Sequence, residues 1–223
     1  AGQKIIPFIW CDNTAEEAAE HYASLFADGR IIHVSRYSEA GKEAHGQRPG
    51  AAMVAAFEVA GLKISALNGG PAFKPNPSIS FFVELDSADE VRRLWDGLST
   101  GGDELMALGS YPWSQCYGWV SDRYNVSWQV SVRPQPSGEP TVRPSLLFTG
   151  DNMGRAAEAQ RFYTDIFPDS AVGLTAHRDA SDADAPGTVL FGQFDICGQG
   201  FNIMDAPGSH GFSFTEGVSL MVS

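Results

Sequence analysis

The 223-residue sequence is poor in cysteine, in cations and in long apolar runs. Its three cysteines, Cys11, Cys116 and Cys197, form no CxxC pair, which argues against a disulfide framework and a zinc motif. Lysine and arginine number 15 against 27 acidic residues, for a net charge of −12. That charge disfavours nucleic acid and anionic membranes as partners. No signal-like core and no run of about 18 apolar residues is present, so we expect a cytoplasmic protein.

What the sequence does have is an internal repeat. An apolar run at 5–10 precedes a helix start at 12–14 with one apolar helical face, and strand-like runs follow at 30–37, 52–60 and 62–67. This predicts a β-α-β-β-β module. The same spacings return in the second half: Tyr22–Phe26 as Tyr163–Phe167, Gly61–Asn68 as Gly198–Asp205, and 79–83 as 218–222. A weaker copy occupies 78–132.

The repeat predicts the domain organisation of an α+β protein. Residues 4–133 hold two modules, which we expect to form one cupped, eight-stranded mixed sheet with helices at about 14–26 and 87–99. The Pro- and Gly-rich residues 134–141 form a linker. Residues 142–223 form a second domain that holds a third module and the opening strand of a fourth.

This second domain leaves a sheet edge and an apolar face without a partner, features that other segments or chains usually cover. We therefore expect either a polypeptide that continues past Ser223 or a second subunit that supplies the missing half. A homodimer is the expected biological unit, with 218–222 placed as 79–83 is in the first half.

Three segments carry a family resemblance: ALNGGP at 66–71, ISFFV at 79–83 and YGWVSDRYNVSWQ at 117–129. They closely resemble PhnB-like proteins of the vicinal-oxygen-chelate (glyoxalase/bleomycin resistance/dioxygenase) superfamily, also catalogued as demethylubiquinone methyltransferase-like domains. One departure is Asn125, where the family usually has glycine, and asparagine tolerates the left-handed conformation that this turn needs. The resemblance implies cupped sheets of paired βαβββ modules around a small-molecule cavity.

Metal-dependent members of that superfamily use His and Glu ligands on the first and last strands of each module. The corresponding positions here are Pro7, counted back from Tyr22, Ile79 and Ser65 in the matching strands, and Gln129, counted from Asp122. These residues make a poor ligand set for a divalent cation. The five histidines form no HxxxH spacing. The glycine-rich segments 68–71 and 198–200 are typical of turns rather than of a Rossmann cofactor loop. We therefore expect neither a metal nor a cofactor.

Strand alternation places Ile9 and Cys11 toward the cavity and Phe8 and Trp10 under the helices, if Pro7 replaces the cup histidine. The full set of predicted pocket-lining residues is Ile9, Cys11, Ser65, Leu67, Trp113, Trp119 and Gln129. No catalytic residue can be assigned, because no base accompanies Cys11 and a structural thiol explains it better.

These observations favour a metal-independent, glyoxalase-fold binding protein or enzyme that acts on a small apolar or aromatic molecule. Three alternatives stay open. They are a metal-dependent lyase, isomerase or dioxygenase, the methyltransferase that the family label suggests, and a non-catalytic interaction module whose cup is filled by side chains.

Overall fold

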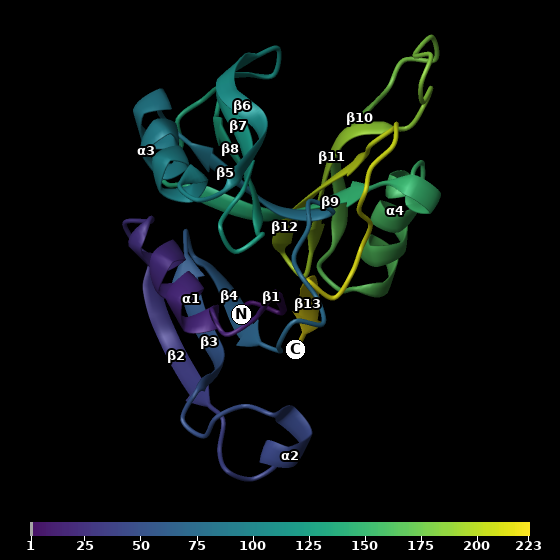
Figure 1. Ribbon diagram of the computed structural model, residues 1–223. Helices are drawn as coiled ribbons and strands as arrows, with labels where there is room; N and C mark the ends of the chain where they lie inside the picture. The colour runs from purple at the N-terminus through teal and green to yellow at the C-terminus, as the bar shows by residue number, and fades with distance from the viewer. Residues whose placement is uncertain (1) are drawn as a thin grey trace.

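The computed structural model describes residues 2–223 as two β-sheets with helices packed on them (Figure 1). The first module comprises β1 (Ile5–Cys11), α1 (Ala15–Ser24), β2 (Arg30–Arg36), the short α2 (Lys42–His45), β3 (Ala52–Val59) and β4 (Leu62–Asn68). The second comprises β5 (Ile79–Leu85), α3 (Ala88–Ser99), β6 (Asp103–Tyr111), β7 (Ser114–Ser121) and β8 (Ser127–Val132). The third comprises β9 (Thr141–Phe148), a 3-10 turn (Gly150–Asn152), α4 (Ala156–Ile166), β10 (Ala171–His177), β11 (Val189–Ile196) and β12 (Gln199–Asp205). β13 (Val218–Val222) ends the series, so the predicted module order is confirmed.

The modules pair differently from the prediction. The eight-stranded sheet has the order β10-β11-β12-β9-β5-β8-β7-β6, which joins the second module to the third. The first module lies in a five-stranded sheet, β13-β1-β4-β3-β2. The expectation that residues 4–133 form one eight-stranded sheet is therefore wrong. After β8 the chain returns antiparallel beside β5, pairing Thr141 with Glu84, so the third module rather than the first shares a sheet with the second.

The two joins between modules have the same register. In the eight-stranded sheet, Ile79 pairs with Leu146, and in the five-stranded sheet Val218 pairs with Ile9. Ile9 and Leu146 hold equivalent places in their modules. Ile9 lies two residues before Cys11, which pairs with Asn68, and Leu146 lies two residues before Phe148, which pairs with Asp205. β13 therefore stands to the first module as β5 stands to the third, so 218–222 and 79–83 are equivalent in register. β13 lies in the sheet of the first module, however, and not with the third module as expected.

Asn68 and Asp205, which recur at the same spacing in the repeat, each bind the start of a helix. The Asn68 side-chain oxygen accepts a hydrogen bond from the Ala15 N–H at 3.0 Å, at the start of α1. Asp205 Oδ1 accepts from the Gly154 and Ala156 N–H groups, at the start of α4. Each side chain thus satisfies backbone donors that a helix start leaves unpaired, and ties the last strand of its module to the helix.

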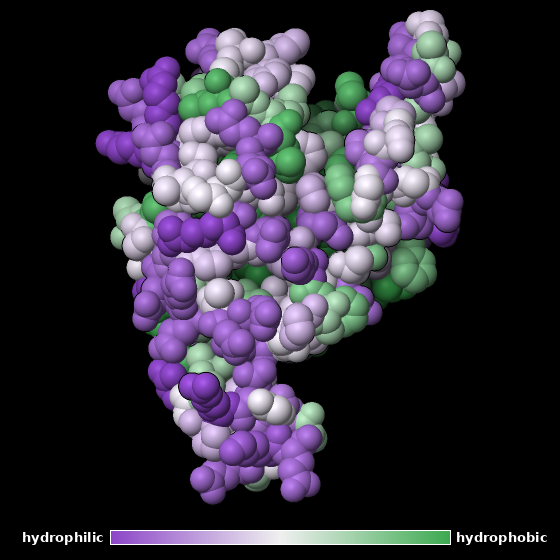
Figure 2. All heavy atoms as spheres, viewed as in Figure 1, coloured by the Kyte–Doolittle hydropathy of each residue, from purple (hydrophilic) through white to green (hydrophobic). Residues whose placement is uncertain are grey.

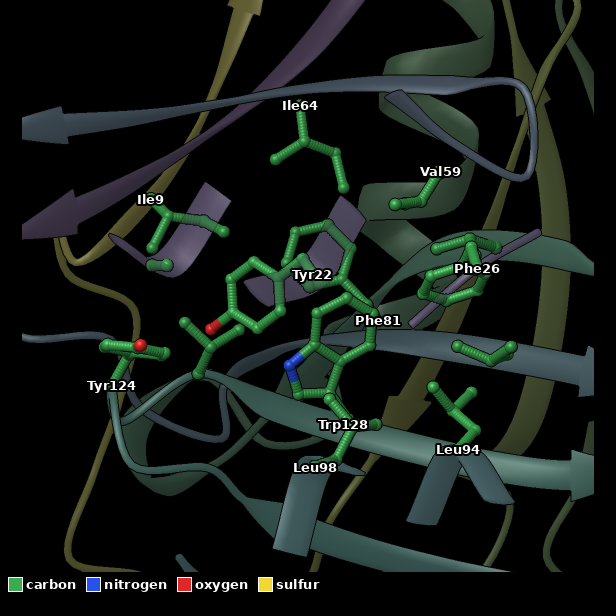
Figure 3. Packing of buried hydrophobic residues seen from close by; sticks show 14 of the residues in the cluster. Ile9, Tyr22, Phe26, Val59, Ile64, Phe81, Leu94, Leu98, Tyr124 and Trp128 are labelled. Atoms are coloured by element: carbon green, nitrogen blue, oxygen red, sulfur yellow. The ribbon is translucent and has the colours of Figure 1, made fainter. Parts of the chain in front are cut away.

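The main core lies where the helix-facing sides of the first two modules meet. Tyr22 of α1 is fully buried against the Trp128 ring of β8, with centroids 5.1 Å apart, and Phe81 of β5 packs on the same indole at 5.0 Å. Figure 3 shows these three rings pointing toward one another, with Leu94 and Leu98 of α3 on the far side. Within residues 2–223, no helix is long and apolar enough to cross a membrane.

Candidate functional site

The candidate site is the inner face of the eight-stranded sheet. Figure 1 shows the sheet bent into two arms that rise from β5 and β9, with α3 outside one arm and α4 outside the other. On β5, Phe81 and Val83 lie in the core beneath α3, so Ser80 and Phe82 project from the opposite face, into the cup. The strand registers then identify which residues share that inner face.

A row of polar residues crosses the middle of the cup. The backbone pairs Gln193–Asn202, Asn202–Ser145, Ser145–Ser80 and Ser80–Ser127 run in register through five strands. Four of these side chains, Ser80, Ser127, Ser145 and Asn202, are at most 2% exposed. Paired residues point to the same side of a sheet, so the inner face has a buried floor of hydroxyl and amide groups.

One half of this floor is held by internal hydrogen bonds. The Tyr117 hydroxyl donates to Gln129 Oε1 at 2.6 Å, and Gln129 Nε2 donates to Ser80 Oγ at 2.9 Å. The Trp119 indole N–H donates to Ser127 Oγ at 2.5 Å. Burial raises the pKa of Tyr117 well above its ordinary value, and nearby Tyr111 adds to the shift. The Tyr117 hydroxyl therefore keeps its proton, and this half of the cup is a fixed network.

The other half of the polar floor contains Asn202. Its side chain is fully buried, and neither its amide oxygen nor its amide nitrogen has a hydrogen-bond partner within the described structure. Leaving a buried polar group unpaired costs on the order of 1–3 kcal/mol. A donor and an acceptor are thus available side by side on the floor of the cup.

Arg143 lies on the same face, two residues along β9 from Ser145, the partner of Asn202. It pairs with Phe82 across the β5–β9 join. A Cβ atom at Gly200 would come within 2.9 Å of Arg143 Nε. Glycine at that position therefore lets the half-buried arginine lie flat against β12.

Aromatic rings cover the polar floor. The Phe82 ring of β5 lies 6.3 Å from the Tyr117 ring of β7 and 6.4 Å from the Phe191 ring of β11, measured between centroids. Along the strands, Phe191 lies on one side of the Asn202–Ser145 pair and Phe82 lies on the other. Their rings therefore meet above those two residues. This aromatic layer accounts for the burial of the floor.

The sequence-predicted pocket residues fall into three places. Gln129 and Trp119 do lie on the inner face of the eight-stranded sheet, and Trp113 lies at its rim, 55% exposed and stacked on Tyr111 at 5.0 Å. Ser65, which pairs with Phe8, and Leu67 lie on the inner face of the other sheet. The structure therefore does not bring this group together into one pocket.

Ile9 and Cys11 lie on the opposite face from the one expected. Both are buried in the core with α1, while Phe8 and Trp10 turn toward the inner face. The prediction counted backwards from Tyr22 through the turn at Asn13, which has φ of 62°, and a slip of one residue exchanges the two faces of a strand. Burial raises the pKa of the Cys11 thiol to about 11, as expected of a structural cysteine.

The residues that sequence reasoning missed are Asn202, Arg143, Phe82 and Phe191. Three of them belong to the third module, which was not expected to share a cup with the second. The available signal was a polar residue at an inward position of an otherwise apolar strand, as in Phe201-Asn202-Ile203.

The described residues contain no group of three or more His, Cys, Asp or Glu side chains placed to hold a metal ion. Ser65 and Gln129, two of the positions considered for ligands, belong to different sheets.

Comparison with known proteins gives a consistent answer. The family described as 3-demethylubiquinone-9 3-methyltransferase matches residues 3–131 and again 140–223. The PhnB protein of Bacillus cereus is 34% identical, with 59% of this chain and 100% of that chain covered and a TM-score of 0.54. A Pseudomonas aeruginosa protein is 24% identical over 59% of this chain and 98% of its own, with a TM-score of 0.51. Glyoxalase I from Zea mays is 10% identical and shares the fold over 94% of this chain and 70% of its own, with a TM-score of 0.53. No curated protein matches.

Proposed function

This chain belongs to the 3-demethylubiquinone-9 3-methyltransferase family, with the PhnB-like vicinal-oxygen-chelate fold, and we propose that it binds a small aromatic molecule without a metal. The proposed site is the inner face of the eight-stranded sheet. The observation that carries the proposal is the buried, unpartnered amide of Asn202 beneath the rings of Phe82 and Phe191.

The geometry specifies what the ligand must offer. A flat apolar body suits this aromatic layer, because aromatic rings favour stacked or edge-to-face contacts. One edge must carry both a hydrogen-bond donor and an acceptor, because the Asn202 amide presents one of each. Binding such a group would satisfy both atoms of that amide and remove the cost of burying them unpaired.

Binding rather than catalysis is the proposed role. The floor consists of neutral amides and hydroxyls, the neighbouring Arg143 guanidinium stays protonated and cannot act as a base, and the Tyr117 hydroxyl already donates to Gln129. Its raised pKa makes it a poor base near neutral pH. We assign no catalytic residue.

The test uses benzamide as a probe, because it combines a flat ring with an amide edge, and toluene as a ring without that edge. Titration calorimetry of the native protein should detect benzamide but not toluene. Asn202→Leu should abolish benzamide binding while leaving the stability equal or higher, since it replaces an unsatisfied buried amide by an apolar group of similar size. Native mass spectrometry would show whether a molecule of this class co-purifies.

Ser65→Ala is the matched control, because Ser65 holds in β4 the place that Asn202 holds in β12. Benzamide should bind this variant as it binds the native protein. Undiminished binding to the Asn202→Leu variant would refute the proposed site.

The second candidate function is an interaction module with a filled cup. It is favoured by the rings of Phe82, Tyr117 and Phe191, which already meet across the cup. In that case the native protein binds neither probe, no molecule co-purifies, and the Asn202→Leu variant is simply more stable.

A further inference from the structure

The guanidinium of Arg143 has a defined place on the inner face of the eight-stranded sheet. Arg143 pairs with Phe82 of β5, and the pairing of Ser145 with Asn202 places Arg143 opposite Gly200 of β12. A Cβ atom at Gly200 would lie 2.9 Å from Arg143 Nε and 3.4 Å from its Cζ. The side chain therefore bends from β9 toward β12, and its guanidinium lies over the Gly200 backbone.

This guanidinium and the Asn202 amide are two binding groups at a fixed spacing. Gly200 and Asn202 are two residues apart on β12 and project from the same face, so the two groups lie roughly 7 Å apart along the strand. The amide is neutral and presents one donor and one acceptor. The guanidinium of Arg143 is positively charged and presents a planar fork of donors, which matches the geometry of a carboxylate.

The charge of Arg143 lies in a largely apolar cup. Hydrophilic residues cover much of the visible surface, whereas hydrophobic residues gather between the two arms of the sheet (Figure 2). Arg143 itself is half-buried. A charge in such surroundings is screened less than a charge in bulk water and attracts an anion more strongly.

Two carboxylates of the chain share the inner face with Arg143. Asp195 of β11 pairs with Gly200, and Glu84 of β5 pairs with Thr141. The ion pairs within residues 2–223 join other residues, namely Arg30–Glu58, Arg36–Glu16, Arg92–Asp89, Arg133–Asp86 and Arg155–Glu158. Neither inner-face carboxylate is therefore in ion-pair contact with Arg143, and a ligand can supply the anion.

We propose that the ligand is an aromatic acid whose carboxylate binds Arg143 while a donor-and-acceptor group at the far end of its ring binds Asn202. This inference rests on the function proposed above and names the class of ligand for the same site. The carboxylate accepts two parallel hydrogen bonds from the guanidinium, a geometry that arginine favours. The ring between the two polar ends lies against the aromatic layer of Phe82 and Phe191.

The spacing is tested with 4-carbamoylbenzoate, whose amide and carboxylate stand at opposite ends of one ring. The matched probe is 2-carbamoylbenzoate, which has the same atoms and charge but carries the two groups side by side. In titration calorimetry, the native protein should bind 4-carbamoylbenzoate roughly 10- to 100-fold more tightly than benzamide, as expected for hydrogen bonds to a charged group. The 2-isomer should show no such advantage, because it cannot reach both groups at once.

Variants of the chain test the role of the guanidinium. Arg143→Gln should remove the advantage of 4-carbamoylbenzoate and leave benzamide binding unchanged, which also shows that the variant folds. Arg143→Lys should keep part of the advantage, because it keeps the charge but lacks the planar fork. Gly200→Ala should act like Arg143→Gln, since the new Cβ displaces the guanidinium. Asp195→Asn is the matched control on the same row of the sheet, and it should bind 4-carbamoylbenzoate at least as tightly as the native protein.

The outcomes separate this inference from the proposed function. If the native protein binds benzamide and 4-carbamoylbenzoate equally tightly, or if Arg143→Gln keeps the full advantage, the carboxylate site is wrong and the benzamide site stands. If the native protein binds neither probe, or if Asn202→Leu binds benzamide undiminished, the proposed function is refuted and the inference is refuted with it.

Discussion

Tyr22→Phe removes one hydroxyl from the centre of the main core. That hydroxyl donates to Asp122 Oδ2 at 2.5 Å, and Tyr22 is fully buried. Asp122 keeps three other donors, the Trp128 indole at 3.0 Å and the backbone N–H groups of Tyr124 and Val126 at 2.8 and 3.0 Å. A buried hydrogen bond to a carboxylate contributes about 1.5–3 kcal/mol. Phenylalanine keeps the ring packing, so the expected loss of unfolding free energy is about 2 kcal/mol.

The repeat supplies the control. Tyr163 holds the equivalent place in α4, and its hydroxyl makes no hydrogen bond within the described structure. Tyr163→Phe should therefore change the free energy of unfolding by less than about 0.5 kcal/mol. In urea, with a slope of about 2 kcal/mol/M, the first variant should unfold roughly 1 M earlier than the second. Equal midpoints for the two variants would refute the assignment of that stability to the Tyr22–Asp122 bond.

Three further predictions test local features. Burial raises the Cys11 pKa from 9.0 to about 11. The contribution of the buried neutral thiol to stability is therefore complete below pH 9 and is lost as pH rises through 11. In urea unfolding over that pH range, the native protein should lose more stability than the Cys11→Ala variant. Gly118→Ala should cost about 1–3 kcal/mol, because its Cβ would lie 2.5 Å from the Trp95 ring, whereas Gly109→Ala meets no atom within 4 Å and should be near neutral in the same assay. At Asn125, where φ is 64°, glycine should be tolerated and valine should lower the unfolding free energy by about 1–3 kcal/mol.

The strands and helices were predictable because their signals are local. Alternation, capping residues and turn glycines gave the element order, and Asn125 adopts the left-handed conformation inferred for it. Gly61 and Gly198 likewise have φ of 73° and 74° in equivalent hairpins, preceded by Ala60 and Cys197 at 49° and 52°. Two successive positive φ values are typical of the tight turn that the sequence indicated.

The partners of the opening strands were not predictable in the same way. β1, β5, β9 and β13 each begin a module with a short apolar run, and each can pair through the same edge. Sequence pattern fixes which face of a strand is buried, but not which of several similar edges it joins. The wrong choice of partner carried over to the site, because it left Asn202 and Arg143 outside the expected cup.

The pairing also decides which surfaces can form a complete cup. The inner face of the eight-stranded sheet has both walls, and Gln129 and Trp119 lie on it. The inner face of the five-stranded sheet has a single wall, which carries Ser65 and Leu67.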